Sequence, residues 1–309
     1  MKRQDARFHG ILCLDKPVDF TSFDAVAKLR GMIRQRRIGH GGTLDPFATG
    51  VLPLFLGRAT RLCDMSPVED KRYTVTLRLG VETDTQDMTG KVLKECDGSV
   101  SRADLEALIP EFTGAQQQLP PMYSAVQVGG QRLYDLARQG IEVERQPRDI
   151  TIHHINLLEY DRDSRRAVLD VGCSKGTYIR TLCHDLGQKL GVGGAAETLR
   201  RTEALGFSLE DCCGYDRIAS ALEEGEQAFE ALLLPLETVF RSCPAVYLSP
   251  AQDKMFRNGV RMDLARIHGV PQQHDGLLRV LGTDHAFLGV ARASYETSEL
   301  ITVRNFCGG

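Results

Sequence analysis

The sequence lacks any long apolar run: no window approaches the roughly eighteen uninterrupted apolar residues that a membrane-spanning helix needs. Its first ten residues, MKRQDARFHG, also lack the apolar centre of a secretory signal. The composition, 42% hydrophobic and 26% charged over 309 residues, is ordinary for a globular protein. We therefore expect a cytoplasmic protein rather than a membrane-embedded or exported one.

The cysteines lack the spacing of a metal site or of a disulfide framework. There are nine of them, an odd number, and no two form a C-x-x-C pair. The adjacent Cys212 and Cys213 match no zinc spacing. Thiols of a cytoplasmic protein stay reduced, so we expect neither disulfide bridges nor bound zinc.

Several motifs of nucleotide-binding and hydrolytic enzymes are also missing. The sequence has no G-x-x-x-x-G-K-[ST] loop, no G-x-G-x-x-G turn after a strand, no G-x-S-x-G elbow and no H-E-x-x-H. His153 and His154 are neighbours, and in a strand neighbouring side chains point to opposite faces. His184 and Asp185 have no third ligand at a useful spacing. We expect no metal and no organic cofactor.

The net charge gives little indication of a nucleic-acid partner, because it is -3. An RNA-binding protein of this composition needs local basic patches. The clearest candidate is RGMIRQRR at residues 30–37, with four arginines in eight residues. The same run is equally typical of a solvated helix face.

Alternation of apolar and polar residues predicts two strands. Residues 73–79 place Tyr, Val, Leu and Leu on one face and polar residues on the other. Residues 167–173 alternate in the same way. A turn-rich segment at 82–90 follows the first strand and predicts a partner strand near Val92.

Capping residues and helical spacing predict three helices. Thr21 or Ser22 is suited to cap the first. Ser101 begins an S-x-x-D capping box before the second. The third covers residues 179–190, and Gly191 ends it. Residues 39–42, Gly-His-Gly-Gly, are predicted to form a loop.

Strands and helices are interspersed, with hairpin-like connections more prominent than repeated βαβ units. This predicts an α+β fold around a mixed, mainly antiparallel sheet. An apolar stretch at 231–236, followed by Pro244 and Pro250, indicates a boundary near residue 242. We expect a large domain at 1–242 and a small β-rich domain at 243–309.

The most informative stretch is GHGGTLDPFATGVLPLFLG at residues 39–57. Its single carboxylate, Asp45, lies between a glycine-rich segment and Pro46. Asp before Pro is a common turn opener. Apolar neighbours nevertheless frame this carboxylate, and a carboxylate among apolar groups needs a cation or hydrogen-bond donors as partner.

Three residues elsewhere are candidates to complete such a site. Arg180 lies in the first turn of the third predicted helix, where its side chain can point back into a cleft. Tyr178 is close by, and Tyr73 begins the cleanest strand. Aromatic rings suit an enzyme that modifies a base, because a base removed from its stack needs a replacement surface. A strand tyrosine is also a common core residue.

The stretch at 39–57 resembles the catalytic motif of the TruB family of tRNA pseudouridine-55 synthases. Further motifs similar to those of that family follow in order: GILCLDKPVDFTS (10–22), DKRYTVTLRLG (70–80), GVETDTQDMTG (80–90), PMYSAVQVGGQRLYDLARQG (121–140), CSKGTYIRTL (173–182) and LRRT (199–202). The resemblance covers most of residues 10–210. It implies a pseudouridine-synthase fold with a small RNA-binding module similar to the PUA domain at the C-terminus.

The resemblance also implies roles for individual residues. Asp45 is expected to be the nucleophile, Tyr73 the ring that stacks on the flipped uracil, and Arg180 the partner of the Asp45 carboxylate. Tyr178 and Leu199 are expected to line the pocket.

Two further residues are expected to act on the RNA or on the loops. His40 is expected to enter the T-loop of the tRNA, and Lys16 to support the active-site loops. The family isomerises the T-loop uridine of tRNA without metal or organic cofactor, and we expect a monomer with no obligatory protein partner.

One position departs from the family pattern. The opening motif normally has Gly where this chain has Asp19. Asp tolerates a left-handed backbone better than most residues, which would preserve the turn. A carboxylate here would weaken contact with an RNA backbone.

Two other functions fit the residues less well. An RNA-binding or RNA-folding protein without catalysis would not need Asp45, Tyr73 and Arg180 together. A carboxylate-dependent hydrolase of nucleosides or sugars would need a second catalytic carboxylate, and none stands out in the sequence.

Overall fold

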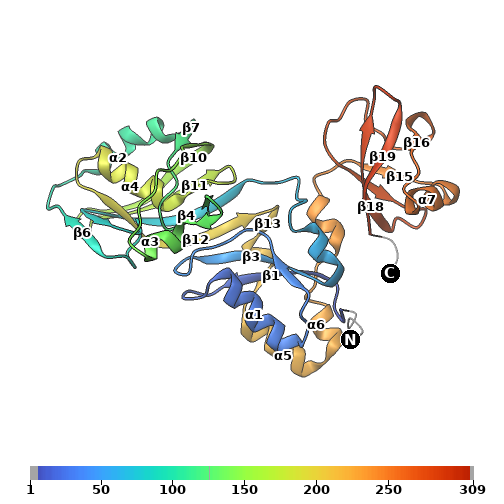
Figure 1. Cartoon of the computed structure of the whole chain (residues 1–309), viewed down its shortest axis with the longest axis horizontal. Coiled ribbons are helices and arrows are strands. Elements are labelled where there is room, and N and C mark those ends of the chain that lie inside the picture. The colour runs from blue at the N-terminus through green and yellow to red at the C-terminus, as the bar shows by residue number, and fades with distance from the viewer. Residues whose placement is uncertain (1–5, 125, 307–309) are drawn as a thin grey trace.

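The computed structural model describes residues 6–124 and 126–306. Figure 1 shows a large body built around one long sheet and a smaller body formed by the C-terminal strands. The helices of the two bodies are α1 (Ser22–Ile33), α2 (Arg102–Leu108), α3 (Leu133–Arg138), α4 (Ile179–Lys189), α5 (Tyr215–Glu224), α6 (Glu226–Glu230) and α7 (Pro250–Arg257). Short 3-10 helices lie at η1 (Gly57–Leu62), η2 (Ile109–Phe112), η3 (Leu209–Asp211), η4 (Leu236–Phe240) and η5 (Leu264–Arg266).

The large body contains a ten-stranded mixed sheet. Its main path runs through β14 (Cys212–Cys213), β1 (Gly10–Lys16), β3 (Thr49–Leu56), β12 (Gly194–Ala204), β4 (Lys71–Leu79), β11 (Arg166–Cys173), β10 (Arg148–Asp161) and β7 (Gly114–Gln118). Off this path, β13 (Phe207–Ser208) pairs with β12, and β2 (Ile38–His40) pairs with β3. The pairs β1–β14 and β3–β12 are parallel and the other pairs are antiparallel. The predicted mixed, mainly antiparallel sheet is confirmed.

Both strands predicted from alternation are confirmed, as β4 and β11. The predicted partner of β4 near Val92 is wrong. A strand does form there, β6 (Val92–Glu95), but it pairs with β5 (Val81–Thr83) in a separate ribbon. The physical reason is that β12 and β11 already occupy both edges of β4. Those partners lie far away in the sequence, where alternation alone carries no pairing information.

All three predicted helices form. Thr21 is the N-cap of α1 and makes a capping box with Asp24. Ser101 and Asp104 make the same box at α2. Helix α4 begins at Ile179, so its first turn carries Arg180. Among the described residues, no helix is long and apolar enough to cross a bilayer.

The loop predicted at residues 39–42 is partly wrong. Gly39 and His40 belong to β2, which pairs antiparallel with Phe55 and Leu54 of β3. The buried side chain of Ile38 fixes the start of this strand. Gly39 packs closely here, because a Cβ at this position would lie 2.8 Å from the Cys63 sulfur and one of the two would have to shift. The glycines thus serve close packing as well as loop formation.

The sheet buries apolar side chains on both faces near β1 and β3. Leu12 and Leu54 join one cluster, which also includes residues of α1, α2, α4 and α5. Ile11 and Phe55, on the opposite face, join a second cluster. In Figure 1, α1, α5 and α6 lie beneath β1 and β3, while α2 and α4 lie at the other end of the sheet.

The C-terminal body has its own five-stranded sheet. Its order is β15 (Ala245–Tyr247), β17 (Leu278–Leu281), β18 (Phe287–Ser294), β19 (Glu299–Asn305) and β16 (Met262–Asp263). A separate core, which includes Val246, Phe256 and Val280, lies inside it. A β-rich C-terminal domain is therefore present, as predicted.

Aromatic contacts and an ion pair join the two bodies. Phe240 stacks on Phe287, which stacks in turn on Phe306, with ring centroids 5.9 and 5.8 Å apart. Arg279 pairs with Glu237 at 2.7 Å. These contacts cross residue 242, and the domain boundary predicted there stays a prediction.

Candidate active site

Asp45 lies in the connection between β2 and β3, and this connection is fixed from beneath by the buried Lys16 at the end of β1. The Lys16 ammonium donates to the carbonyls of Pro17 at 2.9 Å and Pro46 at 3.2 Å. Burial, partly offset by the charge of Asp45, lowers the pKa of Lys16 to about 8. Lys16 therefore holds the backbone next to Asp45, and its role in function stays a prediction.

Ser22 and Arg201 fix the same connection from two other elements. The Ser22 hydroxyl, on α1, accepts from the Leu44 N–H at 2.8 Å. Arg201, on β12, is fully buried and donates to the carbonyls of Gly42 and Thr43, each at 3.2 Å. A loop whose backbone groups are bound in this way can hold a reactive side chain in one position. The role of Arg201 was missed from sequence, although alternation in LRRT places Arg200 and Arg201 on opposite faces.

The Asp45 carboxylate is paired with the guanidinium of Arg180. Nε of Arg180 donates to Oδ2 at 2.8 Å and Nη2 donates to Oδ1 at 3.2 Å. The Arg180 side chain is only 3% exposed, whereas that of Asp45 is 35% exposed. The pair therefore has a buried cation behind a carboxylate that remains accessible from the cavity, and the bidentate geometry fixes its orientation.

Arg180 is itself held by backbone and by a second carboxylate. Its Nη1 donates to the Thr85 carbonyl at 2.7 Å and lies 3.6 Å from the buried Asp87 carboxylate. Its Nη2 donates to the Tyr123 carbonyl at 2.8 Å. The motif at 80–90 drew attention to this segment, but a role for Asp87 was not predicted.

The accessible side of Asp45 opens onto a cavity of about 200 Å³. Its lining includes five of the seven predicted site residues: Asp45, Tyr73, Tyr178, Arg180 and Leu199. The remaining lining residues are Thr43, Leu44, Lys71, Ser124, Gly176, Thr177 and Ile179. Segments more than 150 residues apart in the sequence thus form one site.

Two aromatic residues of this cavity have distinct environments. Tyr73 is 6% exposed, and burial, only partly offset by Arg201, raises its pKa to about 12. Tyr178 is held through its backbone, because its N–H donates to the Gln118 side chain at 2.8 Å and its carbonyl accepts from the same amide at 3.0 Å. Tyr178 is therefore anchored beside Arg180 by the end of β7.

His40 lies outside the lining of this cavity, at the end of β2. Burial and the neighbouring Arg201 lower its pKa, which favours the neutral ring. Asp19 adopts φ of +63°, so the left-handed turn expected at this position is present. The predicted contacts of both residues with RNA stay predictions.

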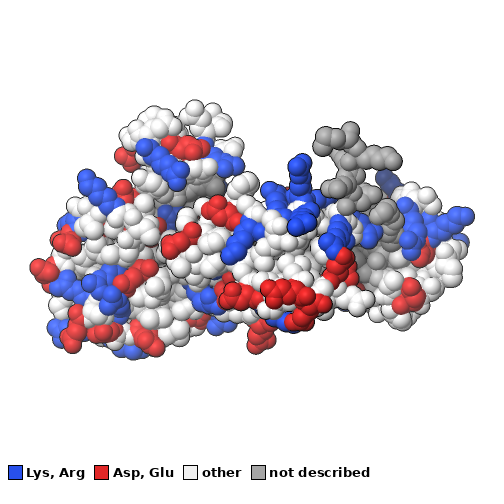
Figure 2. Space-filling model, turned by 90° about the horizontal axis from the view of Figure 1, so that it is seen from below, with Lys and Arg blue, Asp and Glu red and all other residues white. Residues whose placement is uncertain are grey.

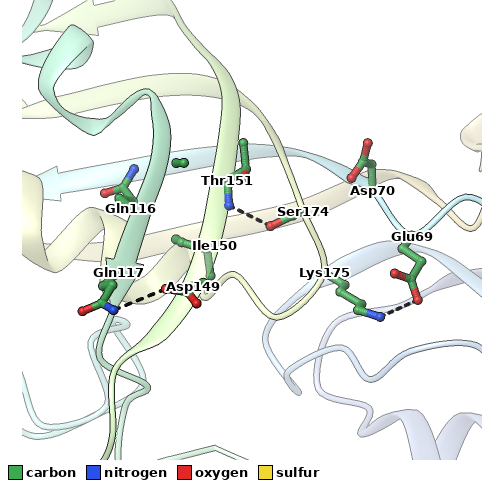
Figure 3. Close-up of a pocket in the computed structure, with 10 residues that line it drawn as sticks. Glu69, Asp70, Gln116, Gln117, Asp149, Ile150, Thr151, Ser174 and Lys175 are labelled. Carbon is green, nitrogen blue, oxygen red and sulfur yellow. Dashed lines mark hydrogen bonds and ion pairs between the residues drawn. The ribbon is translucent and has the colours of Figure 1, made fainter.

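A larger and more open groove of about 610 Å³ lies nearby (Figure 3). Its lining contains Glu69, Asp70 and Asp149 but only one lysine, Lys175. Lys175 points to Glu69 and bonds it at 2.6 Å. Because three carboxylates oppose one cation that is already paired, this groove does not favour a phosphate-bearing ligand. The smaller cavity at Asp45 is the better candidate.

The surface in view carries basic and acidic side chains together, as the small net charge of -3 leads one to expect. Figure 2 shows Lys and Arg side chains interspersed with Asp and Glu over the face in view. Within residues 30–37, Arg30 donates to the Ile38 carbonyl and Arg37 to the Thr60 hydroxyl. Among the described residues, no group of three or more His, Cys, Asp or Glu is arranged to hold a metal ion.

Two domains of one known family are recognisable in the sequence. The profile of the TruB family pseudouridylate synthase N-terminal domain matches residues 30–179. The profile of the tRNA pseudouridylate synthase B C-terminal domain matches residues 180–241. The chain belongs to the TruB family of pseudouridylate synthases. The resemblance stated from the motifs is confirmed.

Curated members of the TruB family match nearly the whole chain. The tRNA pseudouridine synthase B of Pseudomonas putida is 41% identical over 297 residues, covering 96% of this chain and 95% of that protein. The tRNA pseudouridine synthase B of Dehalococcoides mccartyi is 46% identical over 261 residues, covering 84% and 85%.

Solved structures support the same fold. A Cbf5-Nop10-Gar1 complex contains a chain that superposes with a TM-score of 0.75 at 24% identity, covering 99% of this chain and 90% of that one. An H/ACA RNP bound to a substrate RNA containing 2'-deoxyuridine contains another, with a TM-score of 0.76 at 22% identity. At these identities the likeness establishes the fold alone.

Proposed function

We propose that this TruB-family protein isomerises uridine to pseudouridine at position 55 in the T-loop of tRNA, with Asp45 as the nucleophile. The observation that carries the proposal is the bidentate Arg180–Asp45 pair, which presents one carboxylate to a cavity lined by Tyr73. The tRNA substrate is inferred from relatives named tRNA pseudouridine synthase B.

The reaction breaks the bond between ribose C1' and uracil N1 and forms a bond between C1' and uracil C5. The proton on C5 is lost and N1 gains one, so atoms balance without an oxidant, a reductant or a cofactor. A positioned carboxylate can attack C1', attack the uracil ring, or assist a glycal route. In each route Arg180 stabilises the carboxylate and fixes its direction.

The cavity suits a nucleotide taken out of its stack. Tyr73 offers a ring for stacking, and Leu199 and Tyr178 complete the wall. His40, outside the cavity, is proposed to enter the T-loop and help hold it open. Lys16 is proposed to act indirectly, through the backbone at Pro46.

A hydrolytic alternative fits the cavity less well. Hydrolysis of a glycosidic bond uses two carboxylates that flank the bond. Asp87 is the carboxylate nearest to Arg180 after Asp45, but it does not line the cavity. Its Oδ1 already accepts hydrogen bonds from Thr85 and Thr89. One accessible carboxylate therefore favours isomerisation.

We further propose that the protein acts as a cytoplasmic monomer on tRNA without an obligatory protein partner. The PUA-like C-terminal domain, 243–309, is proposed to bind tRNA outside the T-loop, and the catalytic domain is proposed to span 1–242. Metal and organic cofactors are not required in this proposal.

One assay tests the main proposal and its rivals. Purified protein is incubated with unmodified tRNA, and with a T-arm stem-loop in buffer containing EDTA, and the nucleosides are analysed. Pseudouridine at position 55, absent when that uridine is replaced by cytidine, supports the proposal. Free uracil supports a hydrolase, and binding without either product supports a non-catalytic RNA-binding protein. Activity on the stem-loop that EDTA removes and one divalent ion restores would contradict the cofactor-free reading.

A further inference from the structure

The cavity contains a buried hydroxyl that has no partner. Ser124 is 5% exposed and lines the cavity together with Asp45 and Arg180. Its Oγ is buried and makes no hydrogen bond with any residue that the structure describes. A buried hydroxyl left without a partner destabilises the folded state, so a hydroxyl of this kind on a cavity wall is a candidate to bind a ligand.

The position of this hydroxyl is well fixed. The Ser124 N–H donates to the Met122 carbonyl at 2.9 Å, and the Ser124 carbonyl accepts from the Tyr134 N–H at 3.1 Å. The backbone groups of Ser124 are therefore already satisfied, and only the side chain remains. The preceding carbonyl, of Tyr123, accepts from the same Arg180 nitrogen that donates to Asp45.

Nη2 of Arg180 contacts both Asp45 and the carbonyl of Tyr123, the residue before Ser124. Ser124 therefore lies on the part of the cavity wall next to the Asp45 carboxylate. If Asp45 acts at the glycosidic bond, the polar groups of the substrate nearest to this wall are those that flank the bond. They are the uracil O2 carbonyl and the ribose 2'-hydroxyl. A serine hydroxyl can donate to either oxygen.

We infer that Ser124 is a substrate-binding residue whose hydroxyl donates a hydrogen bond to the target uridine beside its glycosidic bond. The substrate then pairs with a hydroxyl that no described residue of the protein contacts by a hydrogen bond. This inference rests on the proposed function, because it takes a flipped uridine as the occupant of the cavity.

The inference predicts opposite effects of Ser124→Ala on stability and on activity. Removal of an unpaired hydroxyl should leave the melting temperature unchanged or raise it. Loss of the contact should lower kcat/KM on a T-arm stem-loop about tenfold, because one hydrogen bond contributes about that factor. A hydroxyl with a purely structural role would instead lower the melting temperature.

Thr302→Val is the matched control. The Thr302 hydroxyl, on β19, is also buried without a partner among the described residues, but it lies in the second sheet, away from the cavity. Its replacement should leave kcat/KM on the T-arm stem-loop unchanged, because the C-terminal domain is proposed to bind tRNA outside the T-loop. A loss of activity in this variant equal to that of Ser124→Ala would overturn the inference.

Three stem-loops locate the contact, with uridine, 2'-deoxyuridine or 2-thiouridine at the target position. Affinity is measured by competition for both proteins, so that an analogue that does not react is still informative. The penalty of Ser124→Ala should disappear with 2'-deoxyuridine if the partner is the ribose, and with 2-thiouridine if it is O2. An equal penalty with all three, or none with uridine, overturns the inference. Wild-type protein that makes no pseudouridine from the uridine stem-loop would instead refute the proposed function.

Discussion

Arg180 donates to both carboxylate oxygens of Asp45, at 2.8 and 3.2 Å, although the two residues are 135 positions apart in the chain. The same guanidinium donates to the carbonyls of Thr85 and Tyr123. One side chain on α4 therefore connects three loops that come from different parts of the sequence. The direction of the Asp45 carboxylate depends on how all of them pack.

The first prediction concerns Asp45. Asp45→Asn should abolish turnover, because the amide is neither a nucleophile nor a counter-charge for a cationic sugar. Affinity for tRNA should stay within about an order of magnitude, since distributed phosphate contacts supply most of it. Single-turnover rates and filter binding on one preparation check this. Asp97→Asn, which replaces an exposed carboxylate away from the cavity, is the control and should keep full activity. Substantial pseudouridine formation by Asp45→Asn would refute the assignment.

The second prediction is a pH dependence set by Lys16. Burial lowers the pKa of this lysine to about 8. Its protonated ammonium holds the backbone at Pro46, so kcat/KM should fall as the pH rises through about 8. In Lys16→Arg the cation persists to much higher pH, and the decline near pH 8 should disappear even if the maximal rate is lower. If kcat/KM falls near pH 8 to the same extent in both proteins, a group other than Lys16 causes the decline.

The same pKa has a consequence for stability. Between about pH 8 and 10.5 the unfolded chain still binds the Lys16 proton that the folded chain has released. The free energy of unfolding contributed by this group therefore increases with pH across that window. Comparison of urea unfolding for wild type and Lys16→Met at pH 7 and pH 10 checks the sign: the difference should shift in favour of wild type at the higher pH.

The third prediction separates stability from loop positioning at the start of α1. Ser22→Ala leaves the Leu44 N–H without its partner and should cost about 1–3 kcal/mol of stability. It should also slow turnover, because Leu44 adjoins Asp45. Thr21→Ala removes only the helix cap and should cost about 1 kcal/mol without slowing the folded enzyme. Denaturant unfolding and single-turnover rates measured on both variants test this. Equal rates in the two variants would show that Ser22 does not position the loop.

The elements with local signals were predictable from the sequence. The alternation of β4 and β11 and the capping boxes of α1 and α2 depend only on neighbouring residues. The sheet order was not predictable in this way, because β12 pairs with β3 and β4, which lie well over 100 residues away. Glycines mark both loops and closely packed strands, which is why β2 was assigned to a loop.

Some residues of the candidate site have a signal in the sequence and others have none. Asp45 is conspicuous because it is the one carboxylate in a glycine-rich motif. Arg180 and Tyr73 were candidates because they lie at the start of a predicted helix and of a predicted strand, and the family resemblance then implied their roles. The buried Arg201 and the unpaired Ser124 hydroxyl have no such signal, since burial and hydrogen-bond satisfaction exist only in the folded chain. Only the hydrogen bonds of the folded structure identify such residues.

The fourth prediction concerns the ring and the hydroxyl of Tyr73. Tyr73→Phe keeps the ring and loses the hydroxyl, so if that oxygen accepts a proton the rate should fall by about 10²–10⁴-fold. The pKa of about 12 means that the hydroxyl is protonated at neutral pH, so it would act through its lone pair or after losing a proton. Tyr73→Leu also removes the aromatic face. Since stacking contributes roughly 1–3 kcal/mol per base, the Leu variant should bind the stem-loop less tightly than the Phe variant.

A core role for Tyr73 leads to a different result, so melting temperature and single-turnover rate are measured together. Tyr215→Phe is the matched control, because the Tyr215 hydroxyl donates to the Ala25 carbonyl at 2.9 Å, away from the cavity. This control should lose stability while its folded molecules react at the wild-type rate. Tyr73→Leu should show the reverse, with a rate loss that exceeds any loss of folded protein. If it instead unfolds readily but reacts normally while folded, Tyr73 only packs in the core, and the stacking surface must be sought elsewhere in the cavity wall.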